Sequence, residues 1–168
     1  MIDQITKIDA PQRGDAAAED ILATSGEDTL YLAIEQLYFA YRAFTAQPDR
    51  ILEQRGLGRV HHRILYFVGR NPRISVNALL ALLSVSKQAL NAPLRQLVEM
   101  RLVAMTSAGH DRRVRQLTLT AVGAKLEAKL TGTQIRQLRG VFDQAGADAK
   151  AGWHQVMAAM IRQAGAGS

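Results

Sequence analysis

The sequence of 168 residues contains no cysteine. Disulfide bonds, thiolate zinc sites, iron–sulfur clusters and thiol redox sensing are therefore excluded. No run of about 18 apolar residues is present, and residues 1–20 lack the apolar core of a signal peptide. Because 48% of the residues are hydrophobic, the chain can bury an ordinary core, and we expect a soluble cytoplasmic protein.

Sequence signatures of catalysis are also missing. There is no glycine-rich phosphate loop, nucleophile elbow or metalloprotease helix. The clustered histidines are His61 and His62, and neighbours in a helix point about 100° apart, so both cannot easily bind one metal ion. His110 and His154 complete no recognisable ligand spacing. We therefore expect no enzymatic activity, no metal and no other cofactor.

Positive charge is concentrated in the middle of the chain. Residues 59–115 contain ten basic and two acidic residues, whereas the remainder contains 11 basic and 13 acidic residues. This segregation is typical of a surface that contacts nucleic acid. A solvated basic face without a partner is the alternative, but it leaves the segregation unexplained.

The apolar periodicity predicts helices in the first part of the chain. Residues 1–26 lack a sustained apolar period and are expected to form a flexible arm. An amphipathic helix should follow, with Ser25 as its N-cap and its end near Gln47, because Pro48 disfavours continuation. Beyond a glycine-containing turn, residues 59–70 predict a second helix.

The next segment predicts a helix-turn-helix. Residues 76–83 are apolar nearly all round, which suits a short helix buried between two others. Ser86 is a good N-cap for the helix that follows, which has leucines on one side and polar residues on the other. Gln and Asn can bind adenine, and Arg or Lys can bind guanine, although a plain solvated surface is the alternative interpretation. The polar residues are Lys87, Gln88, Asn91 and Arg95.

A small wing is predicted directly after this helix. Residues 102–107 and 113–120 have β character, and Leu117 and Leu119 alternate with polar residues in the second segment. The turn between the segments is cationic, and a hairpin tip would let its arginines reach phosphates or a narrow minor groove. These arginines are Arg112, Arg113 and Arg115.

Residues 75–123 resemble the winged helix-turn-helix of the multiple antibiotic resistance regulator (MarR) family. The specific features are "SVSKQALNAPLRQLVEMRLV" followed by "DRR" and, three residues later, "LTLTAVG". The resemblance extends over about residues 28–165. It implies a mainly α fold with a small two- or three-stranded β-wing, N- and C-terminal dimerisation helices, and a homodimer.

The resemblance also implies roles for individual residues. The recognition helix would lie in the major groove, with phosphate and base contacts shared among Ser86, Lys87, Gln88, Asn91 and Arg95. Many relatives carry an aliphatic residue at Pro93 and some carry a larger polar group at Ala92, so base specificity should not be transferred. Because proline removes the hydrogen bond to the Ala89 carbonyl, we expect the helix to bend or loosen, with a kink after Asn91.

In the wing, Asp111 matches a family aspartate that tends to hold a nearby arginine. Arg113 is the candidate for that structural partner, Arg112 for the minor-groove finger and Arg115 for a contact nearer the DNA backbone. The alternative for Asp111 is a simple turn-forming role.

Four regions are expected along the chain. They are a flexible arm (1–26), an N-terminal dimerisation helix with its connector (27–57), the DNA-binding lobe (58–120) and C-terminal dimerisation helices (121–168). Thr120 should cap the first C-terminal helix, and Gly146 should break it. The apolar stripes of these helices need a partner surface, which a second copy would supply, although an intramolecular core is the alternative.

The resulting functional prediction is a bacterial DNA-binding transcriptional regulator, most often a repressor in such families. A dimer would match a near-palindromic site in double-stranded DNA. In the family, small aromatic or anionic ligands often bind near the dimer helices, and the residues that could line such a pocket are Tyr38, Tyr41, Arg42, His61 and His62. The rival is a winged-helix protein-interaction or architectural module without sequence-specific DNA readout.

Overall fold

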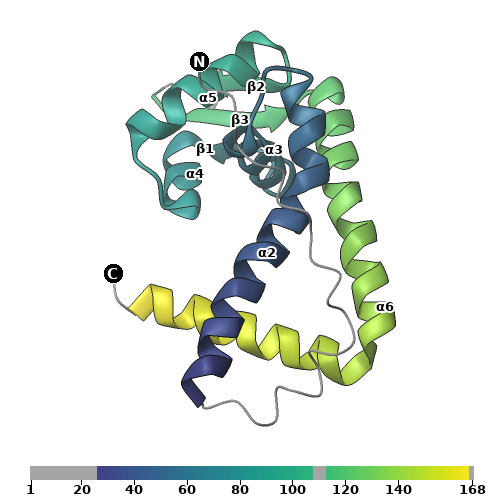
Figure 1. Cartoon of the computed structure of the whole chain (residues 1–168). Helices are drawn as coiled ribbons and strands as arrows, with labels where there is room; N and C mark the ends of the chain where they lie inside the picture. Colours follow the sequence, from purple (N-terminus) through teal and green to yellow (C-terminus); the bar gives the residue numbers. More distant parts are fainter. Residues whose placement is uncertain (1–25, 108–112, 167–168) are drawn as a thin grey trace, which may run out of the picture. The chain divides into compact units, whose positions relative to one another are not determined.

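The computed structural model describes residues 26–107 and 113–166 (Figure 1). The elements are α2 (Gly26–Glu53), α3 (Arg59–Arg70), β1 (Ile74–Ser75), α4 (Val76–Leu83), α5 (Lys87–Glu99), β2 (Val103–Ser107), β3 (Arg115–Leu119) and α6 (Ala121–Ala166). The chain divides into two compact units after Arg42, within α2. The described part is mainly helical with a small sheet, as predicted, whereas the arm and the Ser25 cap lie outside the described residues.

The sheet is antiparallel and has three strands in the order β1, β3, β2. Ile74 of β1 pairs with Leu117 of β3, and Val103 of β2 pairs with Leu119. Leu117 is fully buried, whereas its neighbour Thr118 is only half-buried. The alternation read from the sequence thus places one face of β3 on the core.

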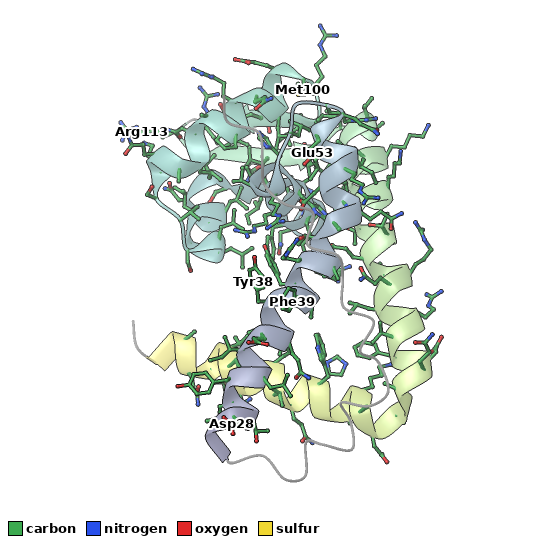
Figure 2. All side chains as sticks on the ribbon, in the orientation of Figure 1. Asp28, Tyr38, Phe39, Glu53, Met100 and Arg113 are labelled. Carbon is green, nitrogen blue, oxygen red and sulfur yellow. The ribbon has the colours of Figure 1, made fainter. Side chains whose placement is uncertain are left out.

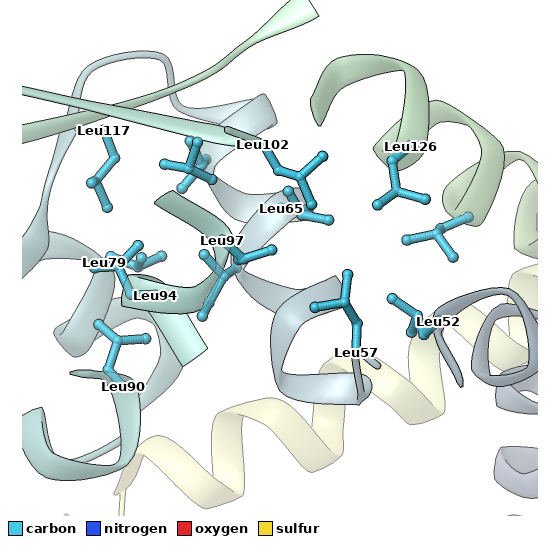
Figure 3. Packing of buried hydrophobic residues seen from close by; sticks show 14 residues of the cluster. Leu52, Leu57, Leu65, Leu79, Leu90, Leu94, Leu97, Leu102, Leu117 and Leu126 are labelled. Carbon is cyan, nitrogen blue, oxygen red and sulfur yellow. The ribbon is translucent and has the colours of Figure 1, made fainter. Parts of the chain in front are cut away.

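One hydrophobic core joins the elements of the second compact unit (Figure 3). The helix α3 packs against α4, α5, β3 and α6, and therefore lies at the centre of the lobe. Spacings of three and four residues put the apolar side chains of each helix on one face. The core residues include Leu52, Ile64, Leu65, Val68, Leu79, Leu90, Leu94, Leu97, Leu117, Leu126 and Leu130.

Pro48 does not end the first long helix, so this prediction was wrong. The helix α2 continues through the buried proline to Glu53. Proline cannot donate a hydrogen bond to the carbonyl of Phe44, four residues earlier. The side-chain Nε2 of Gln134 in α6 donates to that carbonyl at 3.5 Å. The α2 helix is therefore retained by tertiary packing and a substitute donor, neither of which is visible in the local sequence.

The helix α4 has the predicted bounds and α5 begins after the predicted Ser86 cap, but both helices differ in detail from the prediction. In α4 only Leu79 is fully buried, and Leu82 is 48% exposed, so burial all round was wrong. The reason is that α4 packs on α3 and the sheet, which cover one side. The helix α5 is uninterrupted through Pro93. Loosening is therefore not observed, and the bend stays a prediction.

The long helix α6 begins and breaks where the sequence predicts. Gly146 has φ 86° and ψ 173°, which interrupts the helical backbone and kinks α6. The spacing of the apolar residues predicts Val122 on the buried side with Leu126 and Leu130, but Val122 is 64% exposed. Gly123 faces the core in the first turn instead. Among the described residues, no helix is long and apolar enough to cross a membrane.

Candidate nucleic-acid interface

A groove lies between α5 and the wing formed by β2 and β3. Its volume is about 960 Å³, and its lining comes from the start of α4, the outer face of α5 and both strands. The structure thus gathers most of the residues that the sequence suggested for DNA contact. Those lining the groove are Lys87, Gln88, Asn91, Arg95, Arg113 and Arg115.

The helix α5 presents opposite faces to the core and to solvent. Leu90, Leu94 and Leu97 are buried, which fixes the rotation of the helix about its axis. Gln88 and Asn91 are exposed on the other side. Because a helix completes a turn in 3.6 residues, the same spacing that builds the core also aligns the polar side chains.

Ser86 begins α5 as its N-cap. Its Oγ accepts a hydrogen bond from the N–H of Ala89 at 3.2 Å. This bond satisfies one of the donors that are left without a partner at the start of a helix. Ser86 is exposed but belongs to the helix start rather than to the groove lining.

The charge of the groove is strongly positive. Its lining contains four cationic side chains and a single carboxylate, that of Glu99. Arg95 Nε lies 3.6 Å from Glu99 Oε1, and these two side chains are 77% and 68% exposed. An ion pair with this exposure contributes little to stability, and Arg95 can exchange it for a phosphate.

Three further polar or polarisable residues line the groove and were missed from the sequence. They are Ser75, Asn77 and Met105. Ser75 caps α4, since its Oγ accepts from the N–H of Ala78 at 3.1 Å. A serine before an apolar run is an N-cap signal, and Asn77 is a polar residue within that run. Both could have been found by asking which residues begin the first helix of the motif.

The wing places two of its arginines beside the recognition helix. Arg115 lies in β3 opposite Ser107, and its Nη1 donates to Ser107 Oγ at 3.3 Å. Arg113 precedes the strand and extends from the lobe into solvent (Figure 2). The predicted aspartate and minor-groove arginine, Asp111 and Arg112, lie outside the described residues.

The junction between the wing and α6 is fixed by the "LTLTAVG" segment. Thr120 Oγ1 donates to the carbonyl of Arg101 at 2.7 Å and accepts from the N–H of Gly123 at 3.0 Å. The N–H of Thr120 donates to the carbonyl of Leu102 at 3.1 Å. Thr120 therefore caps α6, as predicted, and also joins the ends of both wing strands to the helix.

The candidate ligand residues of α2 are exposed aromatic and cationic side chains. Tyr38 and Phe39 meet edge to face, with ring centroids 5.3 Å apart (Figure 2). The guanidinium of Arg42 lies 5.7 Å from the centroid of the Tyr38 ring, which is within the range of a cation–π contact. Tyr41 is also exposed. These residues, up to Arg42, belong to the first compact unit.

The two histidines of α3 have hydrogen-bond partners in the second unit. Both ring nitrogens of His61 are within 2.9 Å of a partner, at the N–H of Gly58 and at Gln96 Oε1. His62 Nε2 lies 3.5 Å from Thr131 Oγ1. A ligand that used the nitrogens of His61 would have to replace these bonds.

The pKa of His62 is lowered from its ordinary value because burial disfavours the charged imidazole, and the carboxylates of Glu127 and Asp49 partly oppose this effect. Within the described ranges, no group of three or more His, Asp or Glu side chains is arranged to hold a metal ion.

Comparison with protein families and curated proteins gives two matches. The sequence model of the MarR family matches residues 55–114. The chain is 44% identical over 149 residues to the HTH-type transcriptional regulator PetP of Rhodobacter capsulatus, a match that covers 84% of this chain and 90% of that protein. The similarity thus extends over nearly the whole of both proteins.

Solved structures share the fold at low sequence identity. A MarR family transcription regulator has a TM-score of 0.68 and 20% identity, covering 81% of this chain and 90% of that one. A Staphylococcus aureus MepR–DNA complex has a TM-score of 0.65 and 16% identity, covering 77% of this chain and 96% of that one. At these identities the likeness shows the fold alone.

Proposed function

We propose that this chain, which belongs to the MarR family of winged helix-turn-helix transcriptional regulators, binds a near-palindromic site in double-stranded DNA as a homodimer. The observation that carries the proposal is the groove between α5 and the wing. There, base-reading amides and cationic side chains lie on one exposed surface. A nucleic-acid interface requires this combination, since phosphate contacts supply affinity and base contacts supply specificity.

The outer face of α5 is the part of this surface that reads bases. The major groove admits an α-helix, and the amides of Gln88 and Asn91 can each pair with an adenine edge. Arg95, one turn beyond Asn91, can pair with guanine or with a phosphate. Lys87 and Ser86 at the helix start contact the backbone, where the helix dipole favours phosphate.

The wing extends the contact along the DNA backbone. Arg115 is held against Ser107 and therefore offers its charge to a phosphate at a defined position. The family resemblance of the "DRR" segment assigns the minor-groove contact to Arg112, and to Asp111 the role of holding Arg113.

A second copy of the chain covers the exposed apolar residues of the long helices. Leu30, Ile34 and Leu37 recur at helical spacing on α2 and are 66%, 66% and 48% exposed. On α6, Val156 and Met160 are 56% and 45% exposed. Exposed apolar residues that recur on one face of a helix mark an interface, and a twofold dimer presents two recognition helices to two half-sites.

Regulation by this dimer is repression, relieved by a small aromatic or anionic ligand. A protein bound to DNA blocks other proteins from that site. Repression therefore requires no interaction surface besides the one that binds DNA. The aromatic rings and the guanidinium of Tyr38, Tyr41 and Arg42 suit an aromatic anion. The ligand would act by altering the spacing of the two recognition helices.

The test is selection of bound sequences from a random duplex pool with the wild-type chain and with Asn91→Ala, Arg115→Ala and Arg139→Ala. Wild type should recover a near-palindromic motif. Asn91→Ala should relax one base preference, and Arg115→Ala should weaken all sequences alike. The control, Arg139→Ala, removes an exposed arginine of α6 outside the groove and should preserve both motif and affinity. Recovery of no motif would instead favour a protein-interaction or architectural module.

A further inference from the structure

Gln96 of α5 belongs neither to the leucine face nor to the outer polar face of the helix. It is half-buried at the edge between them and does not line the groove. Its side chain points to the connection between α2 and α3. There it contacts Gly56, which lies 40 residues earlier in the sequence. A long polar side chain held in this position restricts how far α5 can move.

Three hydrogen bonds form a closed ring around this side chain. The N–H of Gly58 donates to His61 Nδ1 at 2.9 Å. His61 Nε2 and Gln96 Oε1 are 2.9 Å apart, and Gln96 Nε2 donates to the carbonyl of Gly56 at 3.1 Å. The ring of hydrogen bonds begins at the N–H of Gly58 and ends at the carbonyl of Gly56. Both groups belong to the α2–α3 connection, with Leu57 between them.

The two backbone groups determine every donor and acceptor in the ring. The carbonyl of Gly56 can only accept, so Gln96 must present its NH₂ group there and its oxygen to His61. The N–H of Gly58 can only donate, so His61 Nδ1 carries no proton. The ring of hydrogen bonds therefore requires a neutral imidazole with its proton on Nε2, so only this tautomer of His61 fits.

We propose that Gln96 and His61 are positioning residues that fix the recognition helix α5 against the α2–α3 connection. The connection itself is attached to α2, because the N–H of buried Leu57 donates to the carbonyl of Leu52 at 3.0 Å. The angle at which α5 meets DNA is thus tied to the end of α2. This inference rests on the proposed function, since its effect is on DNA binding.

The ring acts together with the leucine face of α5. Leucines resist lifting of the helix from the core but permit small rotations and slides, because apolar contact is not directional. Hydrogen bonds of defined donor and acceptor restrict those movements. Removing Gln96 should therefore leave the lobe folded while the base-reading side chains lose a fixed orientation.

The experiment compares Gln96→Leu, His61→Gln and the double variant. Leucine matches the size of glutamine but removes both of its bonds. Glutamine at 61, three residues after the N-cap, can still accept from the N–H of Gly58 but is too short to take the place of His61 opposite Gln96. Gln137→Leu, an exposed change on α6, is the matched control. Affinity is measured for the selected motif and for a scrambled duplex, with thermal unfolding alongside.

The expected result is motif affinity lowered about three- to tenfold by each single variant, the effect of losing one or two neutral hydrogen bonds. The double variant should be no weaker than the worse single variant, because both break the same ring. The affinity of each variant for the scrambled duplex should be unchanged. The affinity of Gln137→Leu for the motif should equal that of the wild type. Unchanged motif affinity, or fully additive losses, would overturn the proposal while leaving the proposed function intact.

A measurement on the wild-type chain keeps the test independent of variant folding. Nitrogen-15 NMR of the His61 ring at neutral pH should show a protonated Nε2 and an unprotonated Nδ1. An imidazole of His61 protonated on Nδ1, or on both nitrogens, would directly contradict the proposed ring of hydrogen bonds. If wild type selects no DNA motif although this tautomer is present, the proposed function fails, and with it the effect on DNA binding.

Discussion

Replacement of Gly123 by alanine should destabilise the junction between the wing and α6. A Cβ at this position would overlap the carbonyl oxygen of Leu102 and lie 2.8 Å from its carbonyl carbon. The carbonyl cannot move away easily, because Leu102 is buried and the N–H of Thr120 donates to that oxygen. Alanine therefore has to displace either the wing strand or the first turn of α6.

The size of the effect follows from three contributions. Overpacking costs about 1–3 kcal/mol, and losing one or two hydrogen bonds to the Leu102 carbonyl costs roughly 0.5–1.5 kcal/mol each. Alanine recovers about 1 kcal/mol because it favours helix more than glycine does. The free energy of unfolding should therefore fall by about 3 kcal/mol, which lowers the Tm by roughly 6–12 °C for a chain of this size.

Urea and thermal unfolding of Gly123→Ala would measure this loss, with Gly140→Ala as the control. Gly140 lies in the same helix, and a Cβ there would meet no atom within 4 Å. The control should be neutral or stabilising by up to about 1 kcal/mol, the ordinary gain from glycine to alanine in a helix. A Gly123→Ala protein as stable as Gly140→Ala would refute the steric argument.

Three further predictions concern the cap, a histidine and the DNA contacts. Thr120→Val should lower the free energy of unfolding by about 1 kcal/mol in urea titrations, because it removes the N-cap acceptor of α6. Burial lowers the pKa of His62 below its ordinary 6.5, so the native state binds fewer protons than the unfolded chain. The free energy of unfolding should thus fall as pH decreases from 7 through 6.5 to the native pKa, and His62→Gln should flatten this profile. Arg115→Ala should reduce the slope of log affinity against log salt by about one per half-site; an unchanged slope would exclude a phosphate contact.

Much of the lobe could be predicted because it depends on local signals. Ser86 and Thr120 cap helices as their positions indicated, and Gly146 interrupts α6. The outer face of α5 followed from the spacing of Gln88 and Asn91 once the leucines had been assigned to the core. Helical periodicity and capping depend on neighbours a few residues away, so both can be predicted from the local sequence.

The wrong predictions depend on partners that are distant in sequence. Pro48 stays within a helix because its pyrrolidine ring is buried. In addition, Gln134 donates a hydrogen bond to the carbonyl of Phe44, and Gln134 lies 86 residues after Pro48 in the sequence. Val122 is exposed because the close approach of Leu102 selects Gly123 as the inward residue. A periodic pattern identifies the residues that share a face, but the partner element decides where along that face burial begins.

The polar residues of α5 show how one helix combines both kinds of information. Asn91 and Gln96 are both amides, and from residue type alone either could contact a base. Asn91 lies on the outer face and lines the groove, whereas Gln96 lies at the edge of the core and bonds to His61 and Gly56. A substitution at Asn91 should therefore change which base is preferred, and one at Gln96 should lower affinity for the preferred site without selecting another base. Two amides five residues apart would then separate recognition from positioning within a single helix.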